Sequence, residues 1–124
     1  MKISVQLGPE KIVPSGEASP PSDGAVLSFC GVVRGEENGK PIHSLYYEAY
    51  RPMAENQIQK ILQGLSRQFP CTSAEVFHRL GSVPVGETSL FVRVRAPHRE
   101  EAFQLLARFL DLLKQDVPIW KTQP

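Results

Sequence analysis

Two segments of the sequence repeat apolar residues at three- and four-residue steps, which is the spacing of an amphipathic helix. The first segment starts at Pro52, a residue that a first helical turn accepts, and ends at Pro70. Its apolar positions are Ala54, Ile58, Ile61, Leu62, Leu65 and Phe69. The second starts near Pro97 and ends before Pro118, and its apolar positions are Ala102, Phe103, Leu106, Phe109, Leu110 and Leu113. Each helix has one apolar stripe, so the fold needs another layer to cover both stripes.

Strand patterns provide that layer. Apolar residues alternate over 2–7, and further strand-like segments cover 42–48 and 74–80. The stretch 24–33 is apolar at most positions, which predicts a strand covered on both faces. We therefore expect the order β-β-β-α-β-β-α, an α+β sandwich.

The strand expected before the second helix has two different faces. One face carries Leu90, Val92 and Val94, and the other carries Phe91, Arg93 and Arg95. The first face is predicted to be core, and the second to present cations.

The connections are rich in proline and glycine. A connector follows the first strand as far as residue 23, the charged segment 35–41 is predicted to be a mobile surface loop, and 81–86 a turn. We treat 1–124 as a single domain, because 124 residues are one domain's worth of chain.

The charges are nearly balanced, with 14 Lys and Arg against 13 Asp and Glu. This balance argues against a general nucleic-acid or membrane-surface binder, which would carry basic runs. No apolar stretch approaches the length needed to span a bilayer. We expect a soluble, unexported protein with no nucleic-acid or membrane partner.

The two cysteines, Cys30 and Cys71, show neither a CxxC spacing nor a matching pair of histidines. No metal site, cofactor or disulfide framework is indicated, and a reducing, cytoplasmic compartment is the simplest interpretation. Cys30 lies inside the apolar run 24–33, so we expect it to be buried and unreactive. His43 and His78 lie in strand patterns without ligand spacing and are expected to be structural or surface residues.

Cations stand at the ends of several expected elements. Arg99, next to His98, opens the last helix, where exposed backbone N–H groups and a guanidinium would bind a phosphate or a carboxylate. The alternative is a surface ion pair of Arg99 with Glu100, because such pairs are common and weak. Arg34 ends a strand beside a glycine, a position that forms a site in some proteins and nothing in others.

Two lysines lie at the other end of the last helix. Lys114 would bind an anion or transfer protons if it lay in a partly dry pocket, as would Lys121, which follows Trp120. The alternatives are a favourable interaction of Lys114 with the helix C-terminus and a purely hydrophobic anchor at Trp120.

Arg99 and Lys114 are fifteen residues apart, which is about 22 Å along a continuous helix. One small ligand cannot contact both in one subunit. If both serve one site, two copies of the chain must share it, so we predict a two-fold dimer.

Six pieces of sequence in order resemble the large, catalytic subunit of the molybdopterin synthase family. The resemblance covers 24–121 and leaves 1–23 as a strand with its connector. The pieces are Gly24-Ala25-Val26 through Phe29-x-Gly31-x-Val33-Arg34, Leu45-x-Tyr47-Glu48-x-Tyr50-x-x-Met53, His78-Arg79-x-Gly81, Ala96-x-His98-Arg99, Lys114-x-x-x-Pro118 and Trp120-Lys121.

The resemblance implies an α/β hammerhead-type fold with antiparallel sheets and two main helices, dimerised through its sheets within a heterotetramer. It implies a sulfurtransferase that converts cyclic pyranopterin monophosphate to molybdopterin. The sulfur would come from a small ubiquitin-like carrier with a C-terminal Gly-Gly thiocarboxylate. The residues at catalytic positions are Lys114 and Lys121. The residues at substrate positions are Val32, Val33, Arg34, His98, Arg99, Lys114, Lys121, Thr122 and Gln123.

Two other functions stay open. The same fold would serve as a non-catalytic module that captures a ubiquitin-like tail. The cations Arg34 and Arg99 would also suit an unrelated enzyme of phosphorylated metabolites. Turnover with a thiocarboxylated carrier separates the first from a synthase, and ligand screening separates the second.

Overall fold

The computed structural model describes residues 1–13, 16 and 19–123. Its eleven elements along these residues are β1 (Lys2–Gly8), β2 (Ala25–Val32), β3 (Glu36–Glu37), β4 (Lys40–Pro41), β5 (Ser44–Ala49), α1 (Met53–Gln68), β6 (Ser73–Arg79), β7 (Gly81–Pro84), β8 (Thr88–Ala96), α2 (Arg99–Asp116) and β9 (Ile119–Thr122). The α+β class with two main helices is confirmed. The connector expected before residue 24 includes 14–15 and 17–18, which lie outside the described residues.

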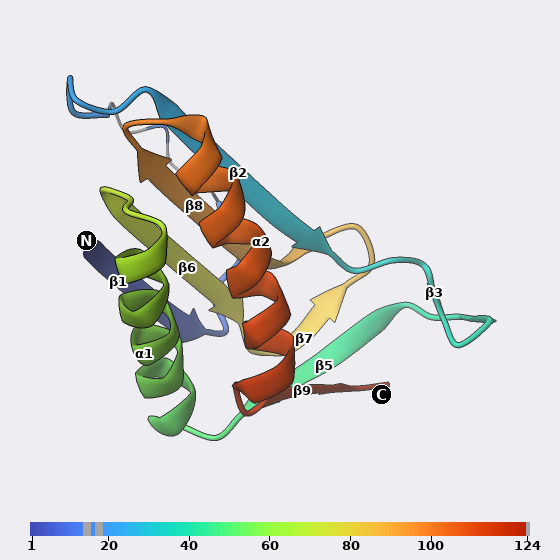
Figure 1. Cartoon of the computed structure of the whole chain (residues 1–124). Helices are drawn as coiled ribbons and strands as arrows, with labels where there is room; N and C mark the ends of the chain where they lie inside the picture. The colour runs from blue at the N-terminus through green and yellow to red at the C-terminus, as the bar shows by residue number, and fades with distance from the viewer. Residues whose placement is uncertain (14–15, 17–18, 124) are drawn as a thin grey trace.

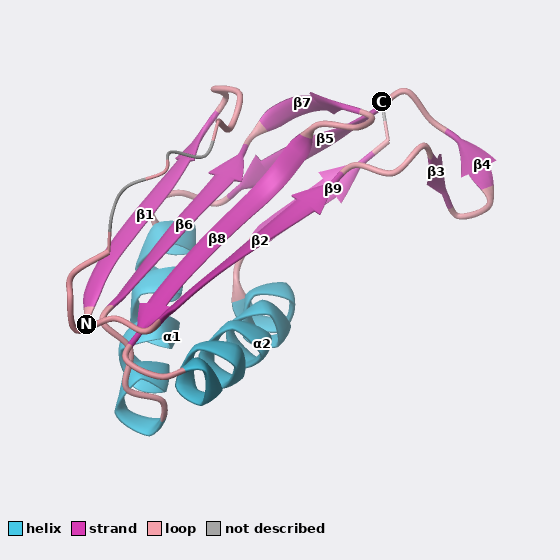
Figure 2. Cartoon of the chain, turned by 90° about the horizontal axis from the view of Figure 1, so that it is seen from above, coloured by secondary structure: helices cyan, strands magenta, loops and turns pink. Residues whose placement is uncertain are grey.

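Four long strands form the main sheet in the order β1-β6-β8-β2. Figure 2 shows α1 and α2 side by side on one face of this sheet. A second sheet, in the order β7-β5-β9, stands at one end of the molecule, and β3 and β4 form a small hairpin beyond it (Figure 1). No helix among the described residues is long and apolar enough to cross a membrane.

Most strand pairs are antiparallel, as expected, but β1 runs parallel to β6. The strand β6 follows α1 in the chain and lies between β1 and β8 in the sheet, parallel to the first and antiparallel to the second.

The helices bury, wholly or in part, most of the apolar positions that their spacing predicts, but in α2 Leu105, which was not predicted, is buried and Phe103 is not. In α1 the buried residues are Ala54, Ile58, Leu62 and Leu65. In α2 they are Ala102, Leu105 and Phe109, whereas Phe103 is 57% exposed. The expectation for Phe103 was wrong because α2 has apolar residues on two adjacent stripes, and contact with the sheet selects the one through Leu105.

The strand β2 also differs from its prediction. Its residues alternate between half-buried and exposed, so only one face is covered, by the helices. Val26 and Val32, on the other face, are 47% and 49% exposed. Cys30 lies on this face and is exposed, so the expectation that it is buried was wrong. The cause is the position of β2 at the edge of the sheet, with no second layer over its outer face in the described chain.

The cationic face of β8 is buried rather than open. Arg93 and Arg95 are only 7% and 6% exposed. Arg95 Nη1 lies 2.7 Å from Glu75 Oε1, and Arg93 Nη1 lies 4.0 Å from the same oxygen. Arg95 Nε also donates a hydrogen bond of 3.0 Å to the Ser19 hydroxyl. These ion pairs and this hydrogen bond engage both guanidinium groups within the fold, so we assign them a structural role rather than ligand binding.

Four short strands were not predicted. The segment 35–41 contains the β3–β4 hairpin instead of a loop without structure, and 81–84 is the strand β7 instead of a turn. The fourth strand, β9, pairs with β5 and fixes the residues after Pro118. Each is only two to four residues long, so its sequence carries too few positions for a strand period to show.

Candidate functional site

The lysines at the end of the chain meet in one cleft, although they belong to different elements. Lys114 lies in the last turn of α2, and Lys121 lies on β9. Between them α2 ends at Val117, whose N–H donates to the Leu113 carbonyl, and the Tyr50 N–H donates to the Pro118 carbonyl. These bonds fold the chain back and bring β9 alongside β5, so that both lysines reach the same opening.

This opening, the lysine cleft, has a volume of about 370 Å³. Its lining residues are Phe29, Gly31, Tyr47, His78, Ser89, Leu90, Leu110, Leu113, Lys114, Ile119, Trp120 and Lys121. Apolar side chains make most of the walls, and among the described residues that line the cleft Lys114 and Lys121 supply the charges. Such a cleft suits a slender, flexible ligand that ends in a negative charge.

The two lysines have different electrostatic surroundings. Lys121 Nζ lies 3.4 Å from Glu37 Oε1 of the hairpin, and its side chain is 49% exposed. No carboxylate of the described residues forms an ion pair with Lys114, which is exposed at the C-terminal end of α2. Lys114 is therefore the cation that is ready to meet a ligand or a proton acceptor.

A histidine at the cleft was not among the predicted site residues. His78 is 8% exposed and contacts the Tyr47 ring edge-on, with 5.1 Å between ring centroids. Its Nδ1 lies 2.9 Å from the Arg79 carbonyl oxygen, which only accepts, so Nδ1 carries the proton. Burial lowers the pKa of His78, and the hydrogen bond to Arg79 raises it by less. The ring is kept neutral, and the expectation of a structural histidine agrees with this burial.

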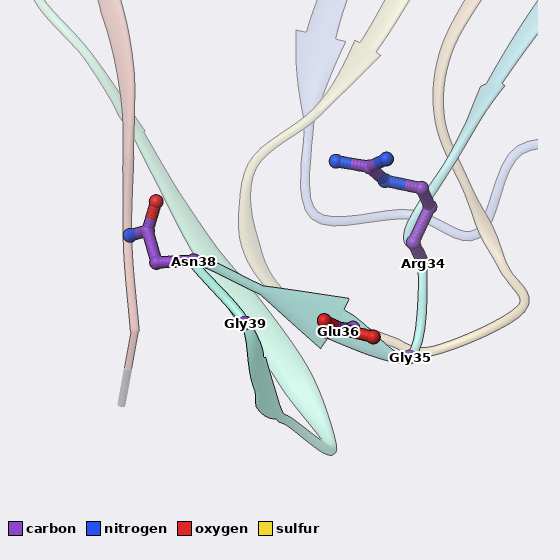
Figure 3. A pocket seen from close by; sticks show the side chains of 5 residues that line it. All are labelled: Arg34, Gly35, Glu36, Asn38 and Gly39. Carbon is purple, nitrogen blue, oxygen red and sulfur yellow. The ribbon is translucent and has the colours of Figure 1, made fainter.

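Arg34 lines a separate cavity of about 520 Å³, formed with Gly35, Glu36, Asn38 and Gly39. Figure 3 shows the Arg34 guanidinium directed into this hollow and Asn38 on the opposite side, beside the C-terminal segment. The cavity that we call the hairpin pocket, about 470 Å³, is lined by Glu37, Asn38, Leu45, Lys121, Thr122 and Gln123. Thr122 and Gln123 thus lie beside Lys121, whereas Arg34 lies on the other side of the hairpin.

The remaining predicted site residues lie apart from the lysine cleft. The exposed His98 precedes α2, and the Arg99 guanidinium is 3.9 Å from Glu100 on a solvent-exposed face. Continuous helix separates Arg99 from Lys114 by about 22 Å. The Val33 side chain is buried with Leu45 and Val83 in a small second core, and Val32 is half-exposed. One chain therefore brings Lys114 and Lys121 together in the lysine cleft, and Lys121, Thr122 and Gln123 together in the hairpin pocket, whereas Arg34, His98 and Arg99 line neither.

Neither a metal site nor a reactive cysteine is built into the cleft. Among the residues that the structure describes, no group of three or more His, Cys, Asp or Glu is placed to hold a metal ion. Burial, with a smaller contribution from the Glu101 charge, raises the pKa of Cys71 to about 11. Its thiol is therefore a poor nucleophile. Neither Cys71 nor the exposed Cys30 is among the described residues that line the lysine cleft.

Comparison with known proteins connects this arrangement with a family. A family model described as "MoaE protein" matches residues 7–116, which include both helices, the main-sheet strands β2, β6 and β8, and only the last two residues of β1. The chain belongs to the MoaE protein family. The resemblance drawn from the sequence motifs is thereby confirmed.

Two curated relatives of this chain carry the same name. The molybdopterin synthase catalytic subunit of Homo sapiens is 43% identical over 103 residues, covering 83% of this chain and 55% of the relative. The protein of the same name from Pyrococcus abyssi is 39% identical over 102 residues, covering 82% and 69%. The chain spans about half the length of the human relative.

Solved structures share the MoaE fold. Molybdopterin synthase from Staphylococcus aureus superposes with a TM-score of 0.86 at 30% identity, covering 95% of this chain and 88% of that one. A complex of subunits 1 and 2 of the molybdopterin-converting factor from Helicobacter pylori gives 0.73 at 20% identity, covering 98% and 83%. The second likeness supports the fold alone.

Sequence reasoning within this MoaE chain missed the walls of the cleft. Phe29, Tyr47 and His78 come from three strands whose ends meet only in the folded sheets. All three stand in the motifs that carried the resemblance, and this was the one available signal. It marked them as members of a pattern without indicating that they face Lys114 and Lys121.

Proposed function

We propose that this chain is the catalytic subunit of a molybdopterin synthase. It acts as a sulfurtransferase that converts cyclic pyranopterin monophosphate to molybdopterin. The sulfur comes from a small ubiquitin-like subunit whose C-terminal Gly-Gly ends in a thiocarboxylate. The observation that carries the proposal is the convergence of Lys114 and Lys121 on one mostly apolar cleft in a MoaE-family fold. The name of the human and archaeal relatives supports it.

The cleft suits the tail of such a carrier. Glycine residues have no side chains, so a Gly-Gly tail fits between the walls made by Phe29, Leu110 and Leu113. The terminal thiocarboxylate is anionic and meets the two ammonium groups. In this arrangement the nucleophilic sulfur arrives with the partner, which agrees with the poor nucleophile at Cys71.

The two lysines have separate roles in the proposal. Lys114, which has no carboxylate partner in the described chain, transfers protons while water cleaves the bond between the carrier's terminal carbonyl carbon and the sulfur now attached to the pterin, so that the carrier leaves as a carboxylate. Lys121 holds the anionic tail and the substrate. Arg34, His98 and Arg99 bind the pterin and its phosphate, for which guanidinium groups provide paired hydrogen bonds.

The second group of cations requires a second copy of the chain. His98 and Arg99 lie about 22 Å from Lys114 along α2, so the site is completed by the other subunit of a two-fold homodimer. The outer face of β2, with Val26, Cys30 and Val32 exposed, is the surface on which the two copies meet. With two carriers bound, the assembly is a heterotetramer, and we place it in the cytoplasm.

The homodimer predicts a concentration-dependent reactivity of Cys30. Alkylation of Cys30 by iodoacetamide at pH 8 should be fast in dilute protein. It should slow as the concentration rises to about 100 µM, because association covers the face of β2. Cys71, with a pKa of about 11, has about one thiol in a thousand ionised at this pH and should react slowly throughout. Peptide mass spectrometry measures both rates. A constant Cys30 rate, with a monomer in sedimentation and full activity, would contradict the dimer.

The synthase itself is tested by single turnover. The chain is mixed with a thiocarboxylated small subunit and cyclic pyranopterin monophosphate, and the pterin product is identified by mass. We expect a product that has gained two sulfur atoms, formed only when the carrier ends in a thiocarboxylate. Carrier binding without any conversion would instead identify a non-catalytic binding module.

A further inference from the structure

The β3–β4 hairpin separates the Arg34 cavity from the hairpin pocket. Asn38, at the tip of this hairpin, lines both cavities. The neighbouring residues of β3 divide between them, because successive side chains of a strand point to opposite faces. Glu36 lines the cavity of Arg34, and Glu37 lines the pocket of Lys121. The hairpin therefore places one carboxylate beside each of two cations that the proposed function assigns to anionic ligands.

The contact on the Lys121 side is direct. Glu37 Oε1 is 3.4 Å from Lys121 Nζ, and the Glu37 side chain is 19% exposed. Lys121 itself lies on β9, where it is paired with Tyr47 of β5. Hairpin and sheet thus meet at this ion pair, which links two segments that are 84 residues apart in the chain.

We propose that Glu37 is an internal competitor for the anion-binding position of Lys121. Its carboxylate occupies the place that the terminal carboxylate or thiocarboxylate of an incoming Gly-Gly tail would take. This inference rests on the proposed role of Lys121 in holding that tail. An entering tail exchanges one carboxylate for another at the ammonium group, and the hairpin is released from β9 as the exchange occurs.

Charge makes the exchange selective for anions. If a neutral tail displaced Glu37 from Lys121, the ammonium group would lose its counter-ion. An anionic tail supplies a new carboxylate in place of the one from Glu37. The contact therefore lowers the affinity for an anionic tail that binds Lys121, and it leaves the affinity for a neutral tail unchanged, because a neutral tail does not displace Glu37. It makes Glu37 a residue that sets specificity rather than a catalytic residue.

The test uses two synthetic peptides of about ten residues that end in Gly-Gly, one with a free carboxylate and one with a C-terminal amide. Their dissociation constants are measured by NMR titration of the full chain. Glu37→Gln should tighten binding of the acid peptide by about two- to fivefold, the range expected for removal of a partly exposed ion pair, and leave the amide peptide unchanged. In the free variant, the backbone signals of 36–40 should move toward their positions in the wild-type complex with the acid peptide.

A matched control is available in α1. Glu55 Oε2 pairs with Arg51 at 2.8 Å, and its side chain is 23% exposed, close to the value for Glu37. Glu55→Gln removes the same charge and also breaks an ion pair, but away from both pockets, so neither peptide should change affinity. In the double variant Glu37→Gln with Lys121→Gln, the gain for the acid peptide should disappear.

The outcomes separate this inference from the proposed function. If the wild type prefers the acid peptide but Glu37→Gln leaves that affinity unchanged or weaker, Glu37 is no competitor, and the role of Lys121 stands. If the wild type binds both peptides equally, the role of Lys121 in holding the tail is wrong, and the inference is overturned with it.

Discussion

Lys114→Ala is expected to slow single-turnover conversion of the pterin by about 100-fold or more, the usual loss when a positioned acid or base is removed. Lys114 lies at the end of α2 on the lysine cleft, and no carboxylate in the described chain neutralises it. Its ammonium group is therefore free to give a proton as the carrier departs. Because Lys121 stays in place to hold the tail, the dissociation constant of the carrier should change by no more than about threefold.

The rate and the affinity together decide the role of Lys114. Quenched reactions with thiocarboxylated carrier give the rate, and titration with the carboxylate form gives the affinity. Lys60→Ala is the control, since Lys60 is an exposed lysine on α1 outside the cleft, and it should leave both values unchanged. If Lys114→Ala kept the wild-type rate, its assignment to proton transfer would be wrong. If it lost affinity and rate in equal measure, Lys114 would bind the tail instead.

The elements with a long period were predictable from the sequence. Sixteen residues of α1 and eighteen of α2 offer several turns over which an apolar stripe repeats, so both helices were found. The stripe of α2 was misplaced at Phe103 because apolar residues also stand one position away from it on the helix surface. The choice between the two stripes is made by β8 and β2, which lie beyond any local pattern.

The exposure of the outer face of β2 could not be predicted from the sequence of a single chain. Its apolar residues Val26 and Val32 predicted a covered strand, yet this chain leaves them half-exposed. Apolar residues on a strand face indicate that the face is suited to burial, but they do not indicate which molecule covers it. If the proposed homodimer forms there, the prediction of two covered faces holds for the assembly and fails only for the single chain.

The candidate site was predictable in its residues and less so in its arrangement. Lys114 and Lys121 stood out through the resemblance, but their shared cleft depends on β9, four residues that become a strand only by pairing with β5. Glu37 could not be identified at all, because a charged residue in a segment without periodicity gives no sign of its partner. The ion pair with Lys121 exists only once the hairpin and β9 are both in place.

Phe109→Ala should have the largest effect on stability, lowering the free energy of unfolding by about 3–5 kcal/mol. Phe109 is fully buried in the middle of α2, where it packs in the core between the helices and the main sheet. Alanine would leave a cavity that rigid strands on one side and α1 on the other cannot fill by relaxing. For a chain of this length, the loss corresponds to a fall in the melting temperature of about 10–20 °C.

The same helix provides the matched control, because Phe103→Ala makes the identical chemical change at a side chain that is 57% exposed. It should alter the free energy of unfolding by about 0.5 kcal/mol or less, since little apolar surface is returned to water and no cavity forms. Urea unfolding followed by circular dichroism measures both variants, and equal slopes show that the unfolded states are comparable. A larger loss at 103 than at 109 would mean that α2 lies on the sheet through the other stripe. Packing through that stripe would rotate α2 about its axis and move Lys114 from its place at the cleft. The comparison therefore also tests the position of the residue on which the proposed chemistry depends.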